Sequence, residues 1–524
     1  MAWRRQDALF GAGLLLLLLL LTAVSWHRWA DIVVDAGLAM NQPLRLLRGE
    51  RLYSDVYQLY GPLPPYICAG LYRIFGVSLS TLYATGFACA ALALALYYWL
   101  ARRILAPAPA AFVSALFLGL CEFKLSGNYI FPYTYAADFA FVLNLAGLAC
   151  LAQFLHTRRR AWMLATGVAA GLALACKIEI GGALAVAAGV VLLCQSKRGR
   201  RRSWWADMAA LVVPGLGIPL AAYAWALQYA SWKQVVLDSY LLLYNLPEPL
   251  RFYNRWRAGL DHPFASLLDM ALAVVVCGLI ALLFWLAARP RRGQPLAVGI
   301  AACLALLAAG AVLHHHPWQS PLRASPLLVI LLPLWLWKNA RPLRPWHWLL
   351  LAFCVDGLLS MGRVILRVPS GGVAGSFVIP VVLLLWVWVM VNLLPARSPF
   401  PAATIQLVHV VLAVAALATL VGIGVRYRRM RVTPLATARG TIAVPPQQKQ
   451  VFDAALAFIS SHTQPGEPVL ALPAGSALNF FTDRPDPLRW DVLIPGYLTP
   501  SDERDAIARL QATHTRYIFL MNRP

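Results

Sequence analysis

Long apolar runs separated by short polar gaps fill the first 425 residues of this 524-residue chain. Most runs have the length that an α-helix needs to cross a bilayer, roughly 17 to 25 residues, and several are near the lower limit. The pattern predicts an all-α polytopic membrane protein with about 13 transmembrane helices. The runs lie near residues 8–25, 77–100, 107–121, 136–155, 161–177, 180–195, 205–229, 264–288, 295–313, 321–337, 346–361, 377–394 and 403–425.

The first run, in MAWRRQDALFGAGLLLLLLLLTAVSW, has two interpretations. Arg4 and Arg5, the leucines and the following TAVS have the layout of a cleavable secretory signal. The apolar stretch is longer than the core of a usual signal and about as long as a bilayer core requires. We therefore predict an uncleaved span.

The gaps between the runs are of two alternating kinds. One kind is basic, and the positive-inside rule assigns it to the cytoplasm, so that an odd number of spans leaves the N-terminus inside and the C-terminus outside. The other kind is aromatic, acidic and proline-bearing, as in 124–138 and 231–263, which predicts that the working surface faces outward. The basic gaps contain Arg102 and Arg103, 158–160, 197–202, 289–292, 338–344 and Arg397.

Composition agrees with this interpretation. The chain is 60% hydrophobic and only 13% charged. Its net charge of +23 arises mainly from the short gaps, where basic residues act as topology signals, so we expect membrane lipids and no nucleic acid as partners. The nine cysteines lie in or beside apolar segments, which indicates small hydrophobic side chains and no disulfide framework.

After Val425 the composition changes. Residues 1–425 are predicted to form the transmembrane domain, 426–449 a linker, and 450–524 a small extracytoplasmic α/β domain. VFDAALAFISSH and TPSDERDAIARLQATH predict helices, the second capped by Thr499, while PVLALP and RYIFLMN predict strands. Phe480 and Phe481, beside a charged turn, predict that the tail packs on the outer loops.

The sequence DIVVDAGLAMNQPLRLLRGERLYSDVYQLYGPLPPY, residues 31–66, places four carboxylates directly after the first span. Together with PYTYAADF, GLALACKIEIGGAL and LALPAGSALNFFTDRPDP, it resembles the GT-C superfamily of polyprenyl-phosphate-sugar-dependent glycosyltransferases. Within that superfamily the chain is similar to the bacterial branch akin to protein O-mannosyltransferases and lipid A aminoarabinose transferases, of the family 39 type. The motifs extend over nearly the whole chain.

The resemblance implies a hexosyl- or pentosyltransferase on the periplasmic side of the bacterial inner membrane. A carboxylate would take the proton of an acceptor hydroxyl, on a lipid, glycan or protein, while lipid phosphate leaves the sugar with inversion. No cofactor is predicted, and a requirement for a divalent metal stays open. The chain departs from many relatives by lacking an acid shortly after the first aspartate motif, where it has AGLAMNQ.

Three aspartates are candidates for catalysis. Asp35 matches the family's catalytic position, with a helix-capping or loop aspartate as the alternative. Asp55 could position the acceptor or cap the turn before Gly61, and Asp31 could share a face with Asp35 or be a solvated loop acid. Glu50 is expected to be a surface charge.

A departing phosphate needs cations. Lys177, at the outer end of the fifth span near Glu179, is the main candidate, although a lysine there could also extend to the lipid headgroups. Further outer-side candidates are Lys124, Arg251, Arg255, Arg323 and Arg363.

The substrate cavity is predicted to include Tyr53, Tyr60, Tyr133, Glu179 and His316. The triple histidine 314–316 could suggest a metal site, but adjacent side chains diverge and no carboxylate follows at motif spacing, so we predict no metal there. The chain also has neither a P-loop nor a GxGxxG nucleotide-binding motif after a predicted strand, which agrees with a lipid-linked donor.

Two other classes of function remain open. A transporter or flippase of lipid-linked glycans would also have many helices and a basic outward cavity, but the chain shows no internal repeat and few charges in mid-span, Asp356 being the main exception. A non-catalytic scaffold is the third possibility. Loss of the Asp35 and Asp55 side chains would inactivate an enzyme and leave a scaffold working.

Overall fold

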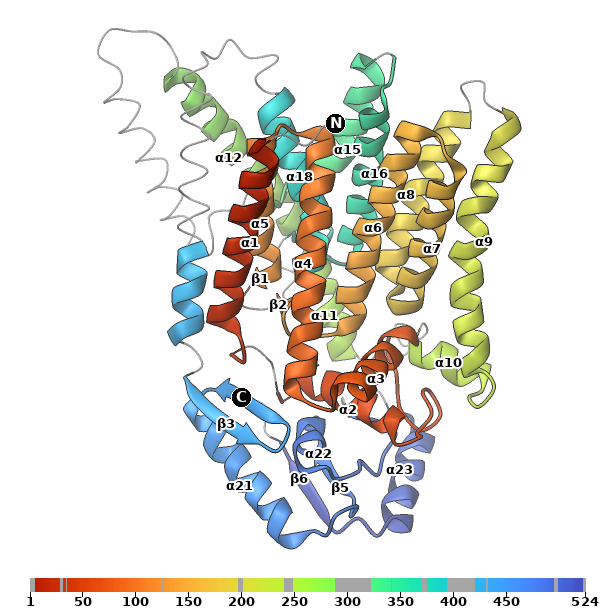
Figure 1. Ribbon diagram of the computed structural model, residues 1–524, viewed down its shortest axis with the longest axis vertical. Coiled ribbons are helices and arrows are strands. Elements are labelled where there is room, and N and C mark those ends of the chain that lie inside the picture. Colours follow the sequence, from red (N-terminus) through yellow and green to blue (C-terminus); the bar gives the residue numbers. More distant parts are fainter. Residues whose placement is uncertain are drawn as a thin grey trace.

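The structure is a computed structural model, in which a helical bundle stands on a small mixed domain (Figure 1). Both parts contribute to the candidate site. The structure describes residues 5–28, 32–33, 35–124, 127–196, 201–239, 248–287, 322–340, 342–368, 375–393, 420–429, 432–493 and 498–521.

The bundle is built from long apolar helices, and in the described residues seven of them are long and apolar enough to cross a membrane, with four shorter apolar helices beside them. The chain is therefore a multi-pass membrane protein, as predicted. The predicted runs 295–313 and most of 403–425 lie outside the described residues, so the total of about 13 spans stays a prediction. The main helices are α1 (Arg5–Ser25), α4 (Leu79–Ile104), α5 (Pro107–Phe117), α6 (Tyr135–Thr157), α7 (Arg160–Cys176), α8 (Ile178–Ser196), α9 (Arg201–Ala226), α12 (Pro263–Ala287), α15 (Ser325–Asn339), α16 (Pro345–Ser360) and α18 (Pro380–Trp388).

Basic gaps that the sequence assigned to one side of the membrane meet at one end of the bundle. Arg102, in the last turn of α4, donates to Asp7 near the start of α1 with an Nε–Oδ1 distance of 2.5 Å. Arg158, just after α6, donates to Gln195 near the end of α8. The candidate catalytic segment and the C-terminal domain lie at the opposite end (Figure 1). The predicted separation of basic and catalytic gaps is therefore present in the fold.

Four short helices cover the end of the bundle that faces the C-terminal domain. They are α2 (Asp35–Leu47), α3 (Leu63–Phe75), α10 (Trp232–Ser239) and α11 (Glu248–Ala258). Prolines 64 and 65 fit the first turn of α3, where the backbone amides have no helical acceptor to reach. The loop between α2 and α3, residues 48–62, carries the second aspartate candidate.

The C-terminal domain contains the predicted helices and strands. Helix α21 (Pro446–His462) precedes β5 (Val469–Leu472) and α22 (Ser476–Thr482), and α23 (Pro500–Ala512) leads to β6 (Tyr517–Leu520). Strands β5 and β6 pair in parallel. The Thr499 side chain accepts from the backbone amide of Asp502 at 3.2 Å, so the predicted N-cap of α23 is confirmed.

The segment predicted to be a linker differs. Within 426–449 the chain forms an antiparallel hairpin of β3 (Thr433–Thr437) and β4 (Gly440–Val444), and α21 already begins at Pro446. Leu435 and Ile442 pair across the two strands and are fully buried. These few apolar positions among arginines and threonines give too short an alternation to predict a strand, and burial against the rest of the protein stabilises the hairpin.

The C-terminal domain packs closely against the catalytic end. Helix α22 lies on α2, and Phe480 stacks on Tyr72 of α3 with ring centroids 6.2 Å apart. Phe480 and Phe481 are both buried, as a contact surface requires. Gly37 permits the close approach, because a Cβ there would lie 2.7 Å from Ser476 Oγ and 2.9 Å from the backbone nitrogen of Ala477.

Candidate active site

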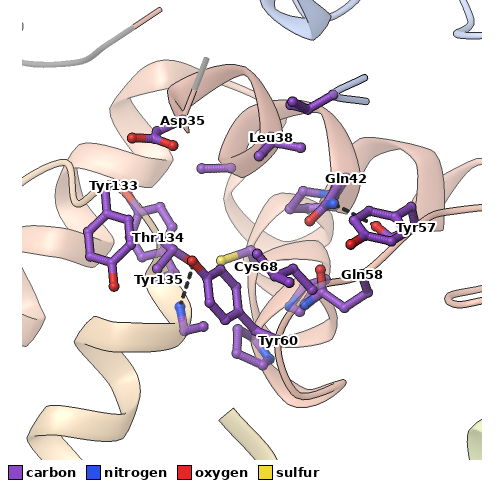
Figure 2. Close-up of a pocket in the computed structure, with 17 residues that line it drawn as sticks. Asp35, Leu38, Gln42, Tyr57, Gln58, Tyr60, Cys68, Tyr133, Thr134 and Tyr135 are labelled. Carbon is purple, nitrogen blue, oxygen red and sulfur yellow. Dashed lines mark hydrogen bonds between the residues drawn. The ribbon is translucent and has the colours of Figure 1, made fainter. Parts of the chain in front are cut away.

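A cavity of about 160 Å³ lies between α2, the loop before α3, and the segment that leads into α6 (Figure 2). Its wall is rich in tyrosine and proline and has few charges. The polar residues on the wall are Asp35, Gln42, Tyr57, Gln58, Tyr60, Tyr133, Thr134 and Tyr135.

Asp35 is the first residue of α2 and lies on the cavity wall. A carboxylate is favoured there, because the first turn of a helix presents unsatisfied amides and the positive end of the helix dipole. Asp35, Leu38 and Gln42 follow one another at helical spacing along the side of α2 that faces the cavity (Figure 2). Asp35 is half-buried, so it can be reached by a ligand.

Lys177 lies behind two tyrosines of the wall. It follows the last residue of α7, and its side chain is almost fully buried. Its Nζ donates to the Tyr133 hydroxyl at 2.8 Å and lies 4.1 Å from the centroid of the Tyr60 ring. The side chain is 4% exposed and is held against two tyrosines that line the cavity, which favours a role at the cavity over an extended surface position.

A second cation and an acid complete this cluster. Glu179, in the first turn of α8, lies 3.5 Å from Lys177 Nζ and 3.1 Å from Arg363 Nη1. Arg363 comes from the short 3-10 helix η3 (Met361–Val364), which packs against α11. Burial raises the pKa of Tyr133, and the charges of Glu179 and Asp35 raise it further. Tyr133 therefore stays protonated near neutral pH.

Tyr60 is held in place by the glycine that follows it. The Gly61 amide donates to the carbonyl of Cys176 at 3.1 Å, and a Cβ on Gly61 would lie only 2.0 Å from the carbonyl oxygen of Ala175. No side chain fits between the loop and the end of α7. This contact brings the Tyr60 ring against Lys177.

Asp55 lies outside the described cavity wall. Its carboxylate accepts from the Arg51 amide at 2.9 Å and contacts the Ser54 hydroxyl at 3.2 Å, which closes the turn 51–55. Tyr53 is fully buried beneath the same loop, and its hydroxyl donates to the Tyr60 carbonyl at 2.9 Å. These contacts favour the turn-capping interpretation of Asp55.

The other predicted cations lie away from the described wall. Arg251 and Arg255 pair with Glu248 on α11, and Arg323 pairs with Asp269. Lys124, in the short strand β1 (Phe123–Lys124), is largely buried, and burial lowers its pKa. Asp31 and His316 lie outside the described residues, as do the other two histidines of 314–316.

A buried arginine joins α2, the loop and the C-terminal domain. Arg45 is 2% exposed and lies 2.7 Å from Glu50 and 3.4 Å from Asp491. It also donates to the carbonyls of Asp55 and Leu488, each at 2.8 Å. Glu50 is thus a partner of a buried arginine, which contradicts its assignment as a surface charge.

The C-terminal domain reaches the cavity itself through Val492, which follows Asp491 and lines the wall. Asn41, one turn before Arg45 on α2, donates to Asp491 at 2.8 Å, and the Tyr57 amide donates to the Arg489 carbonyl at 2.7 Å. None of these contacts was predicted from the sequence. The only signal was the segment LRWD, which directly follows the family motif.

Residues of the types that can bind a metal ion are dispersed in the described part of the chain. No group of three or more histidine, cysteine, aspartate or glutamate side chains there is placed to hold a metal ion.

Comparison with known proteins supports the resemblance at the level of sequence. The model of the dolichyl-phosphate-mannose-protein mannosyltransferase family matches residues 60–225. That range includes Tyr60, Tyr133 and Lys177. No curated protein matches the chain.

Two solved structures share the fold over almost the whole chain. ArnT from Cupriavidus metallidurans, bound to undecaprenyl phosphate, matches with a TM-score of 0.52 and 16% identity, covering 98% of this chain and 89% of ArnT. The apo oligosaccharyltransferase from Archaeoglobus fulgidus matches with a TM-score of 0.53 and 12% identity, covering 97% of this chain and 69% of that protein. The predicted resemblance to GT-C glycosyltransferases is confirmed, and at these identities the structures establish the fold.

Proposed function

We propose that the chain is an integral membrane glycosyltransferase that moves one sugar from a polyprenyl-phosphate carrier to an acceptor hydroxyl. One observation carries the proposal: Asp35 lies on the wall of the cavity, and Lys177 contacts two tyrosines of the same wall. The proposed base thus lies on the wall of the cavity, and the proposed phosphate-binding cation lies directly behind the same wall. The family match and the ArnT fold, solved with undecaprenyl phosphate, support a lipid-phosphate donor.

The proposed reaction is a single displacement with inversion. The acceptor oxygen forms a bond to the anomeric carbon as its proton passes to an Asp35 carboxylate oxygen. The bond between the anomeric carbon and the phosphate oxygen breaks, and its electron pair leaves with the polyprenyl phosphate. A positioned base of this kind contributes roughly 100- to 10,000-fold in rate.

Lys177 and Arg363 are the cations that we assign to the leaving phosphate. Both contact the same Glu179 oxygen, Oε1, so the acid holds both near the cavity when no phosphate is bound. A preorganised cation stabilises charge that develops on a leaving group most strongly where water is excluded, and the Lys177 side chain is only 4% exposed. Arg251 pairs with Glu248 and Arg323 with Asp269, neither of which lines the described wall, so they are weaker candidates.

Substitution of Asp35 tests the base. Asp35→Asn keeps the shape of the side chain but removes its basic oxygen, so transfer from the matching polyprenyl donor should fall at least about 100-fold while donor binding persists. Lys177→Ala should instead weaken donor binding. Asp55→Asn is the matched control and should retain most of the activity. Transfer by purified Asp35→Asn near the wild-type rate would reject the assignment and leave Asp55 or Asp31 as the base.

The proposed site opens on the periplasmic side of the inner membrane. The motivation is that arginine-rich gaps gather at the other end of the bundle, where the positive-inside rule expects cytoplasm. An alkaline phosphatase fused to the C-terminus should therefore be active. Activity of a cytoplasmic reporter at the same position would reverse the orientation.

A further inference from the structure

One arginine of the C-terminal domain, Arg489, holds residues at one end of the cavity. The domain reaches the wall through Val492, and the Tyr57 amide, from another part of the wall, donates to the Arg489 carbonyl at 2.7 Å. We infer that Arg489 is a positioning residue for the acceptor, because it fixes Tyr57 at the end of the cavity into which the acceptor extends. This inference rests on the proposed function and concerns the same cavity.

The proposed reaction gives the cavity a donor side and an acceptor side. Tyr60 and Tyr133 contact Lys177, so the proposed donor phosphate lies beside them. In a displacement with inversion, the acceptor oxygen attacks opposite the leaving phosphate. Asp35 takes the proton of that oxygen, and Gln42 follows Asp35 by two turns, roughly 10 Å, along the same face of α2 (Figure 2). An acceptor held at Asp35 therefore extends along α2 toward Gln42 and away from the phosphate.

Two elements bind the backbone of Tyr57 at the far end of this path. Gln42 Nε2 donates to the Tyr57 carbonyl at 2.9 Å, while the Arg489 carbonyl accepts from the Tyr57 amide. Helix α2 and the C-terminal domain thus fix both polar groups of this peptide backbone. The Tyr57 side chain lines the wall, and Figure 2 shows it on the other side of the pocket from Tyr133. A tyrosine at this place offers an acceptor both flat apolar surface and a hydrogen-bonding group.

The Arg489 guanidinium lies against the same tyrosine. Its Cζ is 5.8 Å from the centroid of the Tyr57 ring and 5.1 Å from that of Trp490. Its Nη2 donates to the Tyr53 carbonyl at 2.9 Å and forms an ion pair with Asp238 of α10. Both partners of this ion pair are 8% exposed. A planar guanidinium can stack and bond at once, so one side chain joins α10, the loop before α3 and the C-terminal domain beside the cavity.

A neighbouring arginine shows the contacts of a structural role. Arg484 donates from all three nitrogens, Nε and Nη2 to Thr463 and Nη1 to the Thr482 carbonyl, each at 2.9 Å. All these partners belong to the C-terminal domain itself. Arg489 instead leaves its buried Nε without a hydrogen-bond partner among the described residues. A buried donor without a partner lowers stability, so stability explains Arg489 less well than Arg484.

Steady-state kinetics of purified full-length variants test the inference. The polyprenyl-phosphate sugars are purified from a strain that lacks the gene, and the remaining envelope fraction of that strain supplies the acceptor. Arg489→Gln keeps a planar polar side chain and removes the charge. The half-saturating amount of acceptor should rise on the order of 10-fold, as expected for a lost cation–π contact and its ion pair, while that of the donor lipid stays at the wild-type value.

Further measurements separate positioning from folding. Arg489→Gln should bind undecaprenyl phosphate as tightly as wild type, which also shows that the variant is folded. Arg489→Lys keeps the charge opposite Asp238 and should recover part of the acceptor affinity. Arg484→Gln, the matched control, should unfold at a lower temperature with both half-saturating amounts unchanged. If Arg489→Gln does not fold, Tyr57→Ala takes its place, because it leaves the ion pair intact and should show the same rise for the acceptor.

The outcomes separate the two claims. A rise for the donor lipid instead of the acceptor, or a fall in the maximal rate alone, would overturn the inference and leave the proposed transferase standing. Effects of Arg489→Gln that match those of Arg484→Gln would also overturn it. If the wild-type protein transfers no sugar from the purified lipids to the envelope fraction, the proposed function fails and the inference fails with it.

Discussion

Removing the Asp491 carboxylate should loosen α2 from the C-terminal domain without touching the cavity wall. Asp491 accepts from Asn41 at 2.8 Å and lies 3.4 Å from Arg45, and its own side chain is fully buried. Asp491→Ala therefore leaves a buried amide without its acceptor and takes one of two carboxylates away from a buried guanidinium. Asp35 begins the same helix, so its position should become less well defined.

The contacts allow an estimate of the cost. A buried donor that loses its acceptor costs about 1 to 3 kcal/mol. A buried charge that loses its only partner costs about 3 to 5 kcal/mol, but Arg45 keeps Glu50 and two carbonyls, so only part of that penalty applies. We expect a total near 2 to 4 kcal/mol, which corresponds to roughly 30- to 1,000-fold in the docking equilibrium.

Hydrogen–deuterium exchange of the purified full-length protein measures this docking. Amides of α2 and of 488–493 should exchange faster in Asp491→Ala by about that factor, and sugar transfer should fall with them. Asp491→Asn, which can still accept from Asn41, should lie between. Asp505→Ala, an exposed acid on α23, is the matched control and should behave as wild type. Wild-type exchange at α2 in Asp491→Ala would refute the idea that this buried cluster positions the helix.

Two further predictions concern the loop and its neighbours. Gly61→Ala should displace Tyr60 from Lys177 and lower transfer on the order of 100-fold, whereas Gly70→Ala, with open space around it, should be tolerated; equal activity of the two variants would exclude a role for the close contact. Burial raises the pKa of Asp238 to about 6 despite its ion pair with Arg489. The folded protein therefore binds the Asp238 proton more tightly than the unfolded chain does. The stabilisation from this proton is fully present below about pH 4 and is lost as the pH rises through 6. Thermal unfolding should show this slope in wild type and a weaker one in Asp238→Asn, and parallel profiles would contradict it.

Local patterns in the sequence predicted much of the fold. Apolar runs of membrane length gave the helices, because backbone groups in lipid must bond within their own segment. The cap at Thr499 and the strands around residues 470 and 518 also follow from short-range rules. Lys177 was a candidate because it lies at the outer end of an apolar run, near Glu179, in a motif that resembles the family's, and the structure added its contacts with Tyr60 and Tyr133.

The contacts that shape the site could not be predicted in this way. Arg45 and Asp491 are 446 residues apart, and no spacing rule links them. Glu50 looked like a surface acid because the sequence does not show that Arg45 folds back onto it. The hairpin at 433–444 was missed for a similar reason. Its few apolar residues stabilise strands only because the rest of the protein buries them, and the sequence does not show that burial.

The distance along the chain between Asn41 and Asp491 also has a temporal consequence. The two residues are separated by 450 positions, so at about 5 to 20 residues per second the ribosome adds the second roughly 20 to 90 s after the first. During that interval all the transmembrane helices can already be in the bilayer, yet Arg45 has no Asp491 and the cavity has no Val492. Maturation of the pocket thus waits for synthesis of the C-terminal domain, and a product released before residue 488 should be inserted in the membrane but inactive.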